Sequence, residues 1–412
     1  MRSTFLSFLF SITALAALGP GLLSAQSPEE LYEAKCGRCH AAYAPESYSA
    51  EDWPGIVRSM RSQAALTEEE EKLLTDYLVG LAEGSGGEEG GAEGPVMGGY
   101  LYTEYFRDQQ KAKNFDLHYL AFTVSGWASD RIQYFAEFEL EHGGTGGNNT
   151  FVEQAYIDFW LTNNLAVKIG GILTPFNRFD ELHDPISNFT ISRPQVAREI
   201  GVSAWKDVGV VLHGFKDLSP DISASFEAYT INGLGDGSNL RGSRQYRDNN
   251  EDRALGGRLN LLIQDRVEVG GSVYNGAWDD DGEHDLTMFG GYVMVRTPIA
   301  DFWGEYSDAT TENPSPDGDG EMNGYFFQAS RLFQEKFRPT IRIGALDYLD
   351  PGSQLGRDPG KGDKDLTEFV LSFAYYPTPK VALKAEYIFF GEGARTEEVD
   401  NNLFGLQAAL RF

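Results

Sequence analysis

Apolar and polar residues alternate along most of the chain after residue 95, in segments of about ten residues. Residues 131–141 show the pattern clearly, with the apolar side chains at every second position: Ile132, Tyr134, Ala136, Phe138 and Leu140, against Gln133, Glu137, Glu139 and Glu141. Residues 336–346 and 380–390 repeat it. A period of two predicts strands with one apolar and one polar face.

The connectors between these segments alternate in length. Short ones, such as "TNN" at 162–164 and "TPIA" at 297–300, take turns with long, acidic, Gly-rich ones such as residues 232–253 and 350–365. This alternation is typical of outer-membrane barrels, and a soluble β protein has no need of it. We therefore predict an antiparallel transmembrane β-barrel of about 16 strands over residues 95–412, ending on the aromatic Phe412.

Residues 26–82 follow a helical period instead. Ser27 with Glu30, and Thr67 with Glu70, form capping boxes ahead of apolar residues at helical spacing. The fold class is therefore mainly β, with a small all-α domain ahead of the barrel. Residues 83–94 contain Gly, Ser, Glu and Ala, which predicts a flexible linker.

Residues 1–25 begin with one Arg, continue with an apolar stretch and end in "LSA". This pattern predicts a signal peptide cut after Ala25, and the alternative is an uncleaved membrane anchor. The mature chain is expected to leave the cytoplasm. The formal net charge of -28 argues against nucleic acid as a partner, because nucleic-acid binding needs a basic surface.

The chain has two cysteines, Cys36 and Cys39, and His40 follows the second directly. Cys-x-x-Cys-His is the attachment signature of a c-type heme, with His40 as the proximal axial ligand of the iron. A thioredoxin-like redox site would need a βαβ context, a disulfide across two intervening residues would stabilise little, and zinc would need four ligands. The sequence therefore predicts one covalent heme c.

Met60 is the candidate for the second axial ligand, since it is the only methionine between the predicted cleavage site and the linker. An ordinary core role is the alternative. The other histidines fall in the barrel half and are interpreted as strand or loop residues: His118, His142, His183, His213 and His284.

Residues 174–204, "TPFNRFDELHDPISNFTISRPQVAREIGVSA", form a long connector that contains apolar residues and charges of both signs. With its flanking segments it resembles the phosphate-selective porin superfamily, in which such a loop folds into the lumen and narrows it. The anion selectivity of that superfamily is not expected here, because the loop has charges of both signs: Arg178, Arg193 and Arg198 against Asp180, Glu181, Asp184 and Glu199.

The order of the chain, a heme motif, a linker and a barrel, resembles the fused monoheme cytochrome c–porin family of outer membranes, which includes iron oxidases. The resemblance implies electron transfer between the cell exterior and a periplasmic carrier such as a soluble cytochrome. Residues 41–49, "AAYAPESYS", differ from the iron-oxidase pattern, so oxidation of Fe(II) or another metal ion, and hence enzymatic activity, stays open.

Size places the helical domain. A barrel of about 16 strands leaves roughly 20 Å of free lumen, and a domain of about 55 residues is roughly 25 Å across. We therefore expect an outer-membrane protein in contact with lipid, its cytochrome domain on the periplasmic side or partly in the lumen. A small metal-ion donor would then enter the lumen. A diffusion porin for small solutes or anions with a tethered cytochrome is the competing hypothesis, and a heme sensor or peroxidase a third.

Overall fold

The computed structural model describes most of the chain after residue 26. The described residues are 27–36, 45, 48, 50, 53–61, 64, 66, 68–84, 95–108, 114–129, 131–144, 150–182, 184–219, 221–235, 240, 244, 246–264, 266–312, 319–348, 365–392 and 400–412.

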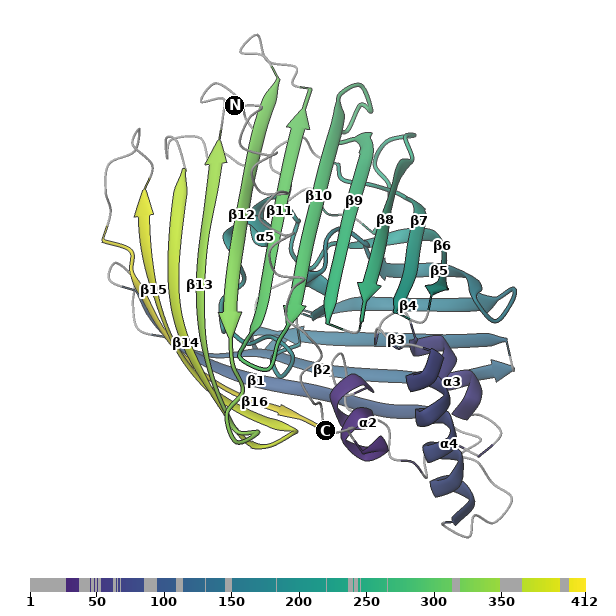
Figure 1. Ribbon diagram of the computed structural model, residues 1–412. Coiled ribbons are helices and arrows are strands. Elements are labelled where there is room, and N and C mark those ends of the chain that lie inside the picture. Colours follow the sequence, from purple (N-terminus) through teal and green to yellow (C-terminus); the bar gives the residue numbers. More distant parts are fainter. Residues whose placement is uncertain are drawn as a thin grey trace.

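Sixteen strands and a few helices make up the described part of the chain (Figure 1). The strands are β1 Val96–Asp108, β2 Asn114–Ser129, β3 Ile132–Glu141, β4 Thr150–Trp160, β5 Leu165–Leu173, β6 Lys206–Ser219, β7 Ile222–Ile231, β8 Ala254–Ile263, β9 Val267–Ala277, β10 Asp285–Arg296, β11 Asp301–Thr311, β12 Gly320–Ser330, β13 Phe337–Tyr348, β14 Leu366–Thr378, β15 Val381–Glu392 and β16 Leu403–Arg411. The helices are α2 Pro28–Cys36, α3 Trp53–Met60, α4 Glu68–Gly84, η3 His142–Gly144, η4 Phe179–Leu182 and α5 Gln195–Glu199.

The strands form a closed barrel in chain order, each pairing antiparallel with its neighbours. The first and last strands close the ring, with Tyr100 opposite Arg411 and Asp108 opposite Leu403. The predicted strand number and antiparallel topology are confirmed. Closure gives every strand a paired neighbour on both sides, so none of the sixteen is an open edge of the sheet.

The barrel is polar inside and apolar outside. In β3, Phe138 is 47% exposed, whereas its neighbours Glu137 and Glu139 are 4% and 2% exposed. In β16, Leu406, Ala408 and Leu410 point outward and Gln407 is buried. A soluble protein would show the opposite distribution, and this one is typical of a barrel whose outer surface meets lipid.

The connectors alternate in length as predicted with one exception, the five residues 109–113 between β1 and β2. Two to six residues separate β2 from β3, β4 from β5 and every later pair at that end of the barrel, whereas 22 residues, 232–253, separate β7 from β8 at the other end. We call these two ends the short-turn end and the long-loop end.

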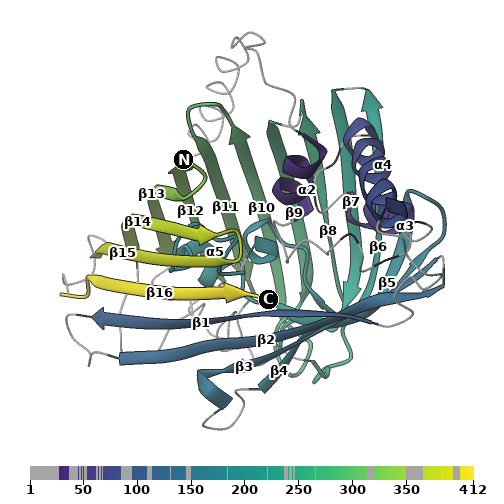
Figure 2. The same ribbon diagram turned by 90° about the horizontal axis from the view of Figure 1, so that it is seen from below.

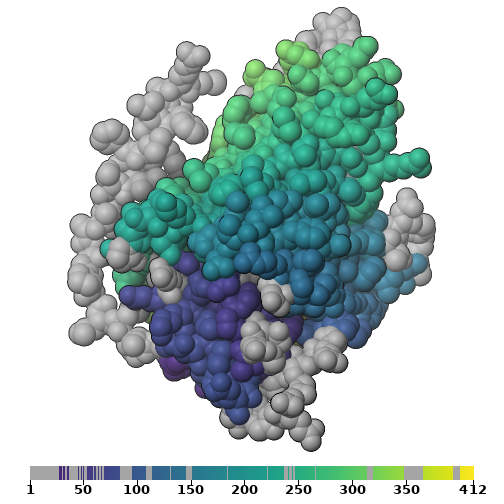
Figure 3. Space-filling view, turned by 90° about the vertical axis from the view of Figure 1, so that its right-hand side faces the viewer, coloured from purple at the N-terminus to yellow at the C-terminus, as the bar shows by residue number. Residues whose placement is uncertain are grey.

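Helices α2, α3 and α4 lie together at the short-turn end (Figures 1 and 2). Leu74 and Leu78 of α4 are fully buried against α2 and α3, while Leu73 and Leu81, also at helical spacing, are about 40% exposed. None of the helices in the described ranges is both long and apolar enough to cross a bilayer. In Figure 3 the helices form a purple and dark blue lobe directly against the blue and teal strands.

The connector from β5 to β6 folds into the barrel, as the resemblance implied. Its short helix α5 contacts β11, β12 and β13 and lies inside the ring of strands in Figure 2. Phe179, Val196 and Ile200 of this connector are at most 2% exposed and pack with inward-facing side chains of the wall. We call residues 174–205 the lumen loop.

Candidate functional site

The helical domain has a compact aromatic centre. Trp53, the first residue of α3, is 1% exposed, and its ring meets those of Tyr32 and Tyr48 edge to face at centroid distances of 6.2 and 5.4 Å. Its indole Nε1 donates a hydrogen bond to the carbonyl of Pro45 at 2.9 Å. Pro45 and Tyr48, which precede α3, are thereby held against the helical core.

Cys36 is the last residue of α2, half-buried and packed against this core. The residue before it, Lys35, pairs with Glu70 of α4 at 2.9 Å and fixes the end of α2 on α4. Cys39 and His40 lie in 37–44, outside the described residues. Of the predicted attachment motif, the structure therefore places the first cysteine only, at a helix end against a small apolar core.

Met60 is the last residue of α3 and is half-buried. Its carbonyl accepts a hydrogen bond from the backbone N–H of Ala64 at 2.8 Å, which turns the chain directly after it. Within the described residues, the apolar core of the domain does not include Met60. A thioether outside the core and a thiol at its edge are donors that fit a c-type heme.

Arg61 fastens the helical domain to the barrel. Its side chain is 7% exposed, pairs with Glu71 of α4 at 2.9 Å, and pairs on its other side with Asp217 of β6. Its guanidinium also lies over the ring of Phe215, 4.7 Å from the centroid. Val96 of β1 and Trp127 of β2 pack against the same helical core, so three strands contact the domain.

A narrow crevice separates the helical domain from the barrel wall next to this contact. The domain contributes Arg61 and Leu66 to it. The wall contributes residues of β6 to β9: Phe215, Ser223, Ala224, Ser225, Asn260, Leu262 and Glu268. Ser225 and Asn260 bond to each other on the polar side of the wall at 3.2 Å. The crevice therefore leads from the helical domain to the polar interior of the barrel.

Two buried cations, on strands β13 and β15, anchor the lumen loop to the barrel wall. Arg342 of β13 is fully buried, pairs with Glu368 at 3.2 Å and donates to the carbonyl of Ser192 in the loop at 2.9 Å. Lys384 of β15 donates to the carbonyl of Asn188 at 2.7 Å. Strand side chains thus satisfy loop backbone groups that cannot reach water, which holds the loop across the lumen.

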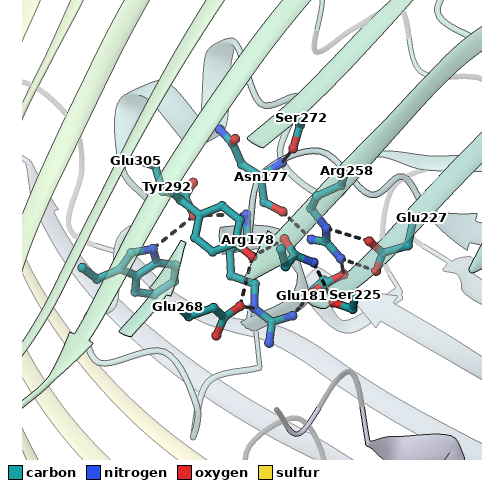
Figure 4. Close-up of polar contacts among 12 residues, drawn as sticks. Asn177, Arg178, Glu181, Ser225, Glu227, Arg258, Glu268, Ser272, Tyr292 and Glu305 are labelled. Carbon is teal, nitrogen blue, oxygen red and sulfur yellow. Dashed lines mark hydrogen bonds and ion pairs between the residues drawn. The ribbon is translucent and has the colours of Figure 1, made fainter. Parts of the chain in front are cut away.

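Close to its start, the lumen loop forms a network of ion pairs with strands β7, β8 and β9 (Figure 4). Arg178 pairs with Glu181 in the loop and with Glu268 of β9, whose carboxylate lies 3.1 Å from the guanidinium. Arg258 of β8 pairs with the same Glu181 and with Glu227 of β7 at 2.8 Å. Burial raises the pKa of Glu181, but the charges of Arg258 and Arg178 lower it further, to about 2. Glu181 is therefore ionised at any physiological pH.

This network does not favour anions. Around the two arginines stand the carboxyl groups of Glu181, Glu227 and Glu268, all in direct contact with a guanidinium. Arginines already matched by carboxylates do not offer a cationic surface to a passing anion.

The sequence did not reveal the partners across the barrel. Arg61 and Asp217 are 156 residues apart. Arg258 and Glu268 lie on strands β8 and β9, whereas Arg178 lies in the lumen loop. The alternation of polar and apolar residues along each strand was the available signal. It predicts which polar side chains face the lumen, but not which residues they contact. Of the other histidines, the structure describes four, and His183 lies outside the described residues.

Comparisons with known proteins divide the chain in the same two parts. The Dihaem cytochrome c family matches residues 32–114, which include most of α2, all of α3 and α4, and the first strand. An uncharacterized protein of Aquifex aeolicus is 24% identical over 338 residues, covering 72% of this chain and 76% of the relative. The cytochrome c-type protein TorY of Haemophilus influenzae is 36% identical over 53 residues, or 13% of this chain and 14% of TorY.

Solved structures of porins share the fold of the barrel. OmpT of Vibrio cholerae with its loop L8 deleted has a TM-score of 0.55 at 13% identity, covering 77% of this chain and 99% of that one. The anion-selective porin from Comamonas acidovorans has a TM-score of 0.55 at 11% identity, with the same coverages. The channel DcaP of Acinetobacter baumannii has 0.53 at 12%, covering 78% and 98%. The chain thus combines a cytochrome c match with a porin-like barrel.

One prediction is wrong on this evidence. The sequence predicted one covalent heme, whereas the matched family is dihaem and points to two hemes. The physical reason is that the number of cysteines shows only how many hemes can be attached by thioether bonds. These 412 residues contain two cysteines, which are enough to attach one heme. Hemes held by axial ligands alone or attached to another chain leave no such trace in the sequence.

Proposed function

We propose that this protein is an outer-membrane porin–cytochrome fusion that transfers electrons between a donor or acceptor in the pore or outside the cell and carriers in the periplasm. The observation that carries the proposal is the docked position of the helical domain. Arg61 and Leu66 line a crevice whose other wall is the polar side of β7 to β9. A redox group in this domain would lie beside the pore interior.

The residues that would hold a covalently attached heme are Cys36, Cys39, His40 and Met60. When bound, a c-type heme supplies reversible one-electron oxidation and reduction. The chain's own part would be to hold it. The cysteines would form thioether bonds, His40 and Met60 would be ligands of the iron, and the core around Trp53 would exclude water. The fit rests on Cys36 at the edge of the apolar core and Met60 outside it.

The proposed organisation is a signal peptide over 1–25, the cytochrome domain over 26–82, the linker over 83–94 and the barrel over 95–412. Short turns of outer-membrane barrels face the periplasm. The domain docked at the short-turn end would then be periplasmic, within reach of a soluble electron carrier. On the other side, the acidic long loops would concentrate a cationic donor such as a metal ion at the mouth.

Heme reduction in intact cells tests the proposal. Cells that export the protein are given ferrous ion or another small donor from outside, and the absorbance change of the reduced heme is followed. Cells with the Cys36→Ser/Cys39→Ser variant, which has no thiols for attachment, are the control. We expect reduction in the first strain alone. The contrary result is a heme that no small donor reduces from outside the cell, but that the same donors reduce once they are given access to the periplasmic side of the outer membrane. That result would exclude electron transfer through the pore.

A diffusion porin with a tethered cytochrome is the second candidate, and the porin-like barrel with charged side chains facing its lumen favours it. Single-channel conductance in planar bilayers separates the two. The lumen loop, anchored by Arg342 and Lys384, and the docked helices both narrow the passage. We therefore expect a small conductance. A wide, ion-conducting channel in the native chain would favour solute diffusion.

A further inference from the structure

Two histidines stand together inside the barrel near the long-loop end, far from the heme motif. His118 belongs to β2, and His142 follows β3 directly. Their ring centroids are 5.2 Å apart and the rings are tilted by 36°. The histidine side chains are 31% and 48% exposed, so a solute at this mouth can reach both.

A carboxylate holds each ring by the same nitrogen. Nδ1 of His118 lies 2.6 Å from Glu104, and Nδ1 of His142 lies 2.7 Å from Asp116. Glu104 is itself buried and accepts a hydrogen bond from Gln407 at 2.8 Å. Metal-binding histidines are oriented in this way, with one nitrogen on a carboxylate and the other on the metal.

The spacing of the rings fits a shared ion. A metal–nitrogen bond of about 2.1 Å puts the ring centre roughly 3.2 Å from the metal, and a tetrahedral angle then separates two ring centres by roughly 5 Å. The measured 5.2 Å matches this separation. Among the described residues no three His, Cys, Asp or Glu side chains already converge on one point. The pair therefore supplies two ligands, and water or a nearby oxygen completes the set.

The backbone and the neighbouring rings hold this arrangement. His142 has φ of 50°, a left-handed conformation uncommon outside glycine, which often marks functional positions. The ring of Tyr119 stacks on His118 at 4.7 Å, and its hydroxyl donates to Glu141 at 2.5 Å. Local contacts thus fix both imidazoles before any ion arrives.

We propose that His118 and His142 bind a divalent transition-metal ion through Nε2 at the long-loop end of the lumen. Imidazole selects ions such as Zn²⁺, Cu²⁺, Ni²⁺ and Fe²⁺ over Ca²⁺ and Mg²⁺. Both histidines belong to the barrel, so this proposal does not depend on whether the helical domain transfers electrons. A loosely held ion here would lie at the entrance of the pore.

The test measures Zn²⁺ and Cu²⁺ binding to the full chain in detergent, purified with a tag that contains no histidine. We expect one site per barrel for Zn²⁺ by titration calorimetry, and nitrogen hyperfine splitting from two imidazoles in the Cu²⁺ EPR spectrum. His118→Ala and His142→Ala should each weaken binding at least tenfold. Glu104→Gln and Asp116→Asn, which keep side-chain size, should weaken it about 10–100-fold.

His213→Ala is the matched control, because His213 also pairs with a carboxylate, Asp158 at 2.9 Å, but on β6 away from the pair. It should bind metal as the native chain does. Circular dichroism of each variant checks that the barrel has formed. Equal binding by His118→Ala, His142→Ala and the native chain would overturn the site. The Cys36→Ser/Cys39→Ser variant should bind Zn²⁺ unchanged, so failure here is distinct from failure of electron transfer.

Discussion

Asp217→Asn tests the docking of the helical domain from the barrel side, leaving the domain's own sequence intact. Asp217 pairs with Arg61, and their side chains are 22% and 7% exposed. Exposed pairs contribute about 0.2–1 kcal/mol, and disrupting fully buried ones costs about 3–5 kcal/mol. This half-buried pair lies between, at about 2 kcal/mol. The ratio of docked to undocked domain should fall about 30-fold, because about 1.4 kcal/mol corresponds to tenfold.

Hydrogen exchange of the full chain in detergent, read by mass spectrometry, measures this change. The backbone N–H groups of Ala64 and Leu66 bond to the carbonyls of Met60 and Arg61 at 2.8 and 2.9 Å, beside the crevice. If these amides exchange when the domain undocks, their rates rise in Asp217→Asn by about the same 30-fold. Asn still accepts the hydrogen bond that Asp217 takes from Ser223, so the strand end should not fray.

Arg58→Ala provides the matched control. Arg58 lies on α3, three residues before Arg61, and its side chain is 36% exposed. Its described ion pair, with Glu71 at 3.9 Å, stays within the helical domain. Its removal changes the net charge by one unit, of opposite sign to the change in Asp217→Asn, without touching the barrel. Exchange rates in Asp217→Asn equal to the native ones would refute the docking argument. So would an equal increase in Arg58→Ala, since it would show a general effect of charge.

Three further changes test the other parts of the molecule. Met60→Ala should shift the heme absorption spectrum and lower the reduction potential, because a thioether ligand raises it; unchanged spectra would remove Met60 as a ligand. Arg342→Met leaves Glu368 buried without its cation, at a cost of about 3–5 kcal/mol, and should free the lumen loop and raise conductance, which the exposed Arg331→Met should not. Phe369→Arg, on the outer face, should destabilise the barrel by about 2–4 kcal/mol in denaturant titrations in lipid; no change would place that face in water.

The barrel could be predicted in detail from the sequence because its pattern is local. A strand such as residues 381–389 shows its two faces at every second position, and Lys384 and Glu386 turn out to be buried as the period requires. Turn lengths are equally local. The strand number, the orientation of each face and the two ends of the barrel therefore followed from the chain alone.

Contacts between distant segments could not be predicted in the same way. The inward path of the lumen loop was implied by resemblance, but its anchors depend on which strand faces it after closure. Ser192 meets Arg342, 150 residues later, and nothing in either segment encodes the other. The same holds for Arg61 and Asp217. For the heme motif, the sequence named Cys39 and His40, which lie outside the described residues, so their roles stay predictions.

The lumen loop and the helical domain reach the same place from opposite ends of the barrel. Glu268 of β9 lines the crevice beside the helical domain and also pairs with Arg178 of the lumen loop at 3.1 Å. The loop starts and ends at the long-loop end, where β5 finishes and β6 begins, yet Arg178 extends to a residue next to a short turn. Glu268 is therefore one wall residue that contacts the lumen loop and also lines the crevice beside the helical domain. The charge of this carboxylate is compensated by Arg178 of the lumen loop, so the loop and the crevice share one ion pair.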